Sequence, residues 1–160
     1  AEDTLTAITG LSVNDVDAGS ANITVSLTVA SGTLTVRNDV TGGLVAADIA
    51  GNGTSNVVLT GSQAKINATL AATNGVQFLG ASNFNGTVAL TMLSNDGGNT
   101  GTDPGLTGNG SSEEDSDTVN ITVSAVNDAL RPVGVEVGHL PLTPERVLAT
   151  IAAGSGLEQA

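Results

Sequence analysis

The sequence predicts an all-β fold, an antiparallel sandwich of about seven short strands. The first observation is that apolar and polar residues alternate along most strand-length segments, as they do in strands buried on one face. The second is that turn residues separate these segments at intervals of about 8–12 residues. The third is the composition. The 160 residues include no Cys, Trp or Tyr and only two Phe, so the core must consist of Val, Leu, Ile and Ala.

The clearest strand is Ala21–Val29, in which Ile23, Val25 and Leu27 face one side. Turn signals such as Gly51-Asn52-Gly53 bound the neighbouring segments. The other expected strands are Thr4–Thr9 running on to Leu11–Val13, Thr33–Val36, Asn56–Leu59, Thr87–Leu93 and Thr118–Val126. This number and spacing of strands is typical of an Ig-like β-sandwich.

One segment departs from the period of two. In Gln63–Ala72 the apolar residues recur near helical spacing, Ser62 precedes them as a candidate N-cap, and Asn74-Gly75 follows as a stop signal. We therefore expect one short helical crossover between the sheets.

The chain changes character after Asp128, which predicts a sandwich module over 1–129 and a C-terminal tail over 130–160. In the tail, Val133, Val135 and Val137 alternate as in a further strand. Thr143-Pro144 is a plausible helix start, so we expect a strand-plus-helix tail.

The chain has sixteen acidic and four basic residues, which gives a net charge of −12. Nucleic acid and anionic lipid surfaces both require basic residues, so neither is an expected partner. No apolar run reaches the roughly 18 residues of a membrane span, so membrane insertion is not expected. The single histidine, His139, has no neighbouring Cys, and neither zinc binding nor catalysis is expected of it.

The acidic residues gather at the expected strand ends. In an Ig-like sandwich we expect them to form two groups at opposite poles. The first group is Glu2, Asp3, Asp96 and Asp117, and the second is Asp15, Asp17, Asn127 and Asp128.

Clusters of carboxylate and amide oxygens suit Ca²⁺ better than Mg²⁺, because Ca²⁺ accepts six to eight flexible oxygen ligands. Asx residues at strand ends also serve as ordinary caps and turns. We favour the metal interpretation for Asp15 and Asp17. For Glu113 and Glu114 we favour a solvated charge run.

Several segments, in order, resemble one repeat of the cadherin-like, Ig-like tandem modules of giant bacterial surface adhesins, including RTX-type adhesins. These segments are "EDTLTAITGLSVNDVDAG", "GTLTV", "INATLAATNGVQFLGASNFNGTVALTMLSNDGGNTG" and "DTVNITVSAVNDA", within Ala1–Ala129. The resemblance implies an extracellular, non-enzymatic module whose head-to-tail joints are stiffened by Ca²⁺. It also implies ligand roles for Glu2, Asp15, Asp17, Asp96, Asp117 and the pair Asn127-Asp128. One departure is Leu130, which stands where the family's linker usually has Pro.

The expected function is a calcium-stabilised structural or adhesive module of a bacterial surface protein, of the kind that serves cell adhesion and biofilms. Neighbouring copies of the module are the expected partners, and a cell-surface or matrix target is a second kind to consider. The alternative is a subunit of a self-assembling fibre that donates its tail strand to a neighbour's sheet edge. A third class, a glycan- or protein-binding tip, is less favoured because sugar stacking needs aromatic residues.

Overall fold

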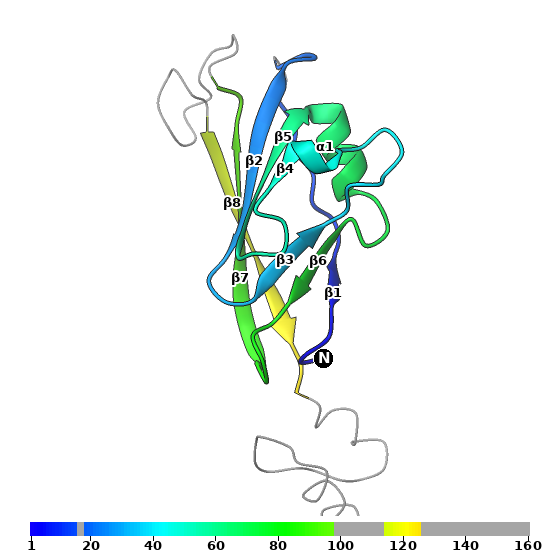
Figure 1. The fold of residues 1–160 in the computed structure, drawn as a ribbon. Helices are drawn as coiled ribbons and strands as arrows, with labels where there is room; N and C mark the ends of the chain where they lie inside the picture. The colour runs from blue at the N-terminus through cyan, green and yellow to red at the C-terminus, as the bar shows by residue number, and fades with distance from the viewer. Residues whose placement is uncertain (16–17, 98–113, 126–160) are drawn as a thin grey trace, which may run out of the picture.

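The computed structural model describes residues 1–15, 18–97 and 114–125. Within these ranges the chain forms two antiparallel sheets with one α-helix and one short 3-10 helix (Figure 1). The expected all-β sandwich is thereby confirmed at the level of its two sheets. The boundary at 129 and the expected tail strand and tail helix lie outside the described residues.

The smaller sheet has the order β1-β6-β3 and the larger one has the order β4-β5-β2-β7-β8. The strands of the smaller sheet are β1 (Thr6–Ile8), β6 (Val76–Leu79) and β3 (Thr33–Val36). Those of the larger sheet are β4 (Ile49–Ala50), β5 (Asn56–Ser62), β2 (Asn22–Val29), β7 (Gly86–Asn95) and β8 (Glu114–Val123). The 3-10 helix, Ala46–Asp48, leads into β4.

The core lies between the two sheets and is almost entirely aliphatic. In β2 every second residue is buried, as the alternation predicts. Val25 and Leu27 are buried in the same apolar cluster as Leu34 of β3 and Phe78 of β6. Each fully buried side chain of this size contributes roughly 1.5–3 kcal/mol by leaving water, so one cluster holds both sheets together.

The crossover helix α1, Gln63–Leu70, connects β5 of the larger sheet to β6 of the smaller one. Ser62 occupies the expected N-cap position, although its side chain makes no capping hydrogen bond. The helix ends two residues before the predicted Ala72, and Asn74 adopts a positive φ of 55° shortly afterwards. Among the described residues, no helix combines the length and the apolar character that crossing a bilayer requires.

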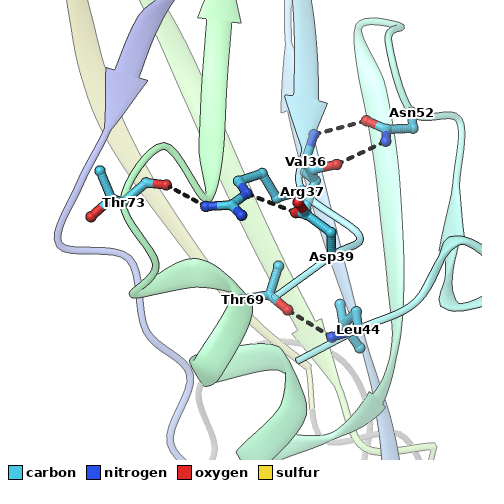
Figure 2. A network of polar contacts seen from close by, with 7 residues as sticks. All are labelled: Val36, Arg37, Asp39, Leu44, Asn52, Thr69 and Thr73. Carbon is cyan, nitrogen blue, oxygen red and sulfur yellow. Dashed lines mark hydrogen bonds and ion pairs between the residues drawn. The ribbon is translucent and has the colours of Figure 1, made fainter. Parts of the chain in front are cut away.

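Polar side chains fasten the connections between the sheets (Figure 2). The amide of Asn52 accepts the Val36 N–H and donates to the Val36 carbonyl, both at 2.8 Å. The buried Thr69 hydroxyl of α1 accepts the Leu44 N–H at 2.8 Å. These bonds replace the ladder partners that the backbone lacks at these points.

Arg37, which follows β3, ties two loops together at the surface. Its Nε donates to Asp39 at 2.8 Å and its Nη1 donates to the Thr73 carbonyl at 3.1 Å (Figure 2). The hydrogen bond from Arg37 lowers the pKa of Asp39, and the same bond raises the pKa of Arg37.

Four details differ from the sequence-based expectations. β1 has only three residues, and Leu11–Val13 is not a strand, because its backbone is bonded to α1 instead. β4 and β6 were not predicted; β4 has only two residues, and β6 has four and follows directly after the helix and its turn. β8 begins at Glu114, four residues before the expected Thr118, so Glu114 and Asp115 belong to a strand paired with β7.

Candidate functional site

The candidate ligands lie at the two ends of the sandwich. We call the end that holds Glu2, Asp3 and Ser124 the N-terminal pole, and the end that holds Asp15, Asp96 and the start of α1 the helix pole. Figure 1 shows the N-terminus beside the end of β8 at the first pole, with α1 near the other.

At the N-terminal pole, Glu2 is only 5% exposed. Its N–H donates to the carbonyl of Ser124 at 2.9 Å, which fixes it beside the end of β8. The neighbouring Asp3 has a φ of 55°, and its Oδ1 accepts the N–H of Asn83 at 3.0 Å. A buried carboxylate therefore lies where the chain leaves the larger sheet.

At the helix pole, the side chains of α1 position the segment that carries Asp15. Asn67 accepts the Val13 N–H at 2.9 Å and donates to the Val13 carbonyl at 2.7 Å. Gln63 accepts the Asp15 N–H at 3.1 Å. The Asp15 carboxylate in turn accepts the N–H of Ala18 at 2.9 Å. Asp15 thus caps a local turn, which is the alternative role that the sequence left open for it.

Asp96 directly follows β7 at the same pole and is 3% exposed. The preceding Asn95 accepts the Gly97 N–H at 2.6 Å and donates to Glu114 at 2.7 Å across the two strands. Asn95 therefore holds the backbone on which Asp96 sits.

The prediction that Asp96 and Asp117 share a pole with Glu2 and Asp3 was wrong. Glu2 lies near Ser124, next to the Gly86–Val123 end of the β7–β8 ladder, whereas Asp96 lies beyond its Asn95–Glu114 end. A ten-residue strand separates the two ends by about 30 Å, since each residue advances about 3.3 Å. The prediction placed the start of the first strand and the end of the last strand at opposite poles. In the structure the two lie side by side, because Glu2 is bonded to Ser124 just after β8.

Asp117 belongs to neither pole. Asp117 lies within β8 and pairs with Met92 of β7. Its side chain is exposed and lines a cavity of about 300 Å³ between β7–β8 and the segment 9–12. Asp17, Asn127 and Asp128 lie outside the described residues.

The described residues do not by themselves form a metal site. Within the ranges 1–15, 18–97 and 114–125, no three acidic or histidine side chains lie close enough together to hold a metal ion. The donors at both poles are carboxylate and carbonyl oxygens, which are the ligand types that Ca²⁺ prefers. Six to eight oxygens would be needed, so the chemistry fits while the described set falls short of a complete site.

The residues that position Asp15 were missed at the sequence level. Asn67 and Gln63 were assigned only to the predicted helix. A signal was nevertheless present, because two amide side chains four residues apart lie on one face of a helix.

Comparisons of the chain with protein-family models, with curated proteins and with solved structures found no match in any of the three.

Proposed function

We propose that this chain is a calcium-stabilised structural or adhesive module of a bacterial surface protein, with an Ig-like or cadherin-like sandwich. The observation that carries the proposal is the buried carboxylate of Glu2, bonded through its backbone to Ser124. Burying a carboxylate is costly unless hydrogen bonds or a cation compensate for its charge.

The chain itself can bring further ligands to Glu2. Asn127 and Asp128 follow Ser124 by three and four residues, a reach of at most about 14 Å. Their side chains and Glu2 would supply carboxylate and amide oxygens to one ion. This grouping replaces the one expected from the sequence.

At the helix pole, the corresponding acids are Asp15 and Asp96, and Asp17 follows Asp15 by two residues in the sequence. In a head-to-tail array, the N-terminal pole of one module would meet the helix pole of the next, so an ion could join the two sets.

The mechanism is electrostatic. Without a cation, the acids of a chain with net charge −12 repel one another, and with Ca²⁺ the same acids hold the poles and the joint rigid. Extracellular calcium modules bind at roughly 10⁻⁴–10⁻³ M, so millimolar calcium outside a cell would keep them occupied. The extracellular location, the bacterial context and the non-enzymatic role rest on the family resemblance.

Calcium titration by calorimetry tests the proposal. The wild-type chain should bind Ca²⁺ with a heat that Glu2→Gln weakens, since this change removes one carboxylate and keeps its shape. Asp39→Asn is the matched control, because Asp39 is an exposed acid that pairs with Arg37 and is not one of the proposed ligands. No binding heat in the wild type, or equal weakening by both variants, would reject the role of Glu2.

A second candidate function is the subunit of a self-assembling fibre that exchanges its tail strand. The observation that favours it is the outer edge of β8, which has no strand partner among the described residues. An open edge can accept an extended segment from a neighbouring chain.

A further inference from the structure

The larger sheet ends in a long strand, β8, that is paired along only one edge within the described residues. β8 has ten residues and pairs with β7 alone within the described part of the chain. Its second half, Thr118–Val123, carries no charge and consists largely of residues that favour strands. A long uncharged edge of this kind invites pairing with another segment.

The sandwich is also open beside this edge. Val119 pairs with Leu90, so both side chains lie on the face that looks toward the smaller sheet. Leu90 is fully buried, whereas Val119 is 46% exposed. Farther along the same face of β8, Ile121 and Val123 are again buried.

The cavity of about 300 Å³ lies at this opening. Val119 and Asp117 line one wall, and the segment Thr9–Ser12 lines the other. The space is therefore bounded by the edge of one sheet and by a non-strand segment that continues from the edge strand of the other sheet.

We propose that the segment Val133–Val137 of the same chain pairs antiparallel with the open edge of β8, beside this cavity. The segment reads V-G-V-E-V, so its three valines share one face and Glu136 takes the other. Paired on β8 with the valines toward the cavity, it extends the apolar face of Val119 and leaves Glu136 in solvent.

The connection between the two segments suits this arrangement. Nine residues, 124–132, separate Val123 from Val133, which is enough for an antiparallel return. Pro132 immediately precedes the proposed strand, outside the positions that must donate to the ladder. The new edge would be short and would carry Gly134 and Glu136, features that protect sheet edges from further pairing.

The same chain is a better occupant than a second copy. A short tether gives the segment an effective concentration in the millimolar range, about that of a flexible linker. Two copies that each carry a net charge of −12 repel one another. The inference does not depend on calcium, and its failure would leave the proposed calcium role intact.

Engineered disulfides in the full chain test the pairing, because the native sequence has no cysteine. Asn120 lies on the solvent face of β8, since its neighbours Val119 and Ile121 face the core. We would combine Asn120→Cys separately with Gly134→Cys and with Glu136→Cys, which share that face in two neighbouring registers. The matched control combines Asn120→Cys with Val135→Cys, whose side chain would point to the opposite face.

After oxidation at low micromolar concentration, non-reducing electrophoresis and peptide mass spectrometry would identify the products. At least one of the two test pairs should form an intrachain disulfide in several-fold higher yield than the control. Equal yields in all three variants would overturn the proposal. Disulfides formed mainly between chains would also overturn it, and would support the exchanged-strand fibre instead.

Hydrogen exchange gives a second test that needs no cysteine. The amides of Val119–Ile121, which both registers cover, should exchange several-fold more slowly in the wild-type chain than in Val135→Asp. Gly134→Asp, which places the same charge on the solvent face, should leave this protection unchanged. Fast exchange at these amides in the wild type would contradict the pairing.

Discussion

Replacing Asn67 by Ala removes the clamp that holds the backbone of Val13 against α1. Both hydrogen bonds to Val13 are short, at 2.9 and 2.7 Å, and Val13 itself is 6% exposed. The substitution therefore leaves one N–H and one carbonyl in a buried place without their partner.

Each such loss costs about 1–3 kcal/mol when water cannot replace the partner. Asn67 is half-buried, so some water can enter, and we expect a combined loss of about 2–3 kcal/mol in the free energy of unfolding. For a chain of this size this corresponds to a decrease of roughly 8–12 °C in Tm, at about 4 °C per kcal/mol.

Urea unfolding monitored by circular dichroism would measure this change. The matched control is Asn38→Ala, an exposed residue in the loop after β3, which should change stability by less than about 0.5 kcal/mol. If both variants unfolded at the same urea concentration as the wild type, the Asn67 clamp would not stabilise the fold as we argue.

Three further predictions concern other contacts. Gly32→Ala should destabilise the fold strongly, because an added Cβ would clash with the Leu79 carbonyl oxygen. Gly10 has a similar positive φ with no atom close to an added Cβ, so Gly10→Ala measures the cost of the backbone conformation alone. Equal decreases in Tm for the two variants would contradict the steric argument. Thr69→Val should lower the free energy of unfolding by about 1–3 kcal/mol, because the buried Leu44 N–H loses its acceptor; an unchanged urea midpoint would refute this. Asp39→Asn should barely change the free energy of unfolding at pH 7, because the ion pair is exposed. The pKa of Asp39 is lowered in the folded chain, so any contribution of the pair to stability is present at neutral pH and is lost as the pH falls below the ordinary value of 3.8. A loss of stability confined to alkaline pH would contradict the assignment.

The sequence predicted most of the larger sheet because its strands alternate over many residues. In this sheet, β2 begins and ends within a residue of the expected bounds. In the smaller sheet, β3 has the predicted bounds, and α1 begins at the expected Gln63. By contrast, β6, which is as short as β3, was missed where it follows directly after the helix and its turn.

The candidate site was less predictable for a physical reason. Local pattern identified the acids, but which acids lie near one another depends on the order and direction of the strands. Glu2 and Ser124 are adjacent because β8 ends beside the first residues of the chain. This contact joins residues more than one hundred positions apart. The clamp of Asn67 on Val13 is likewise a long-range contact: the spacing of Gln63 and Asn67 places two amides on one helix face but does not identify the segment that they bind.

The most direct test of the calcium role is the thermal unfolding of the wild-type chain in calcium and in chelator. With a dissociation constant of roughly 10⁻⁴–10⁻³ M, about 10 mM Ca²⁺ should add about 1.4–2.7 kcal/mol to the free energy of unfolding. This predicts a Tm about 3–10 °C higher in calcium than in chelator, with a smaller increase in the same concentration of Mg²⁺. An identical Tm in calcium and in chelator would contradict the proposed role of the acids at the two poles.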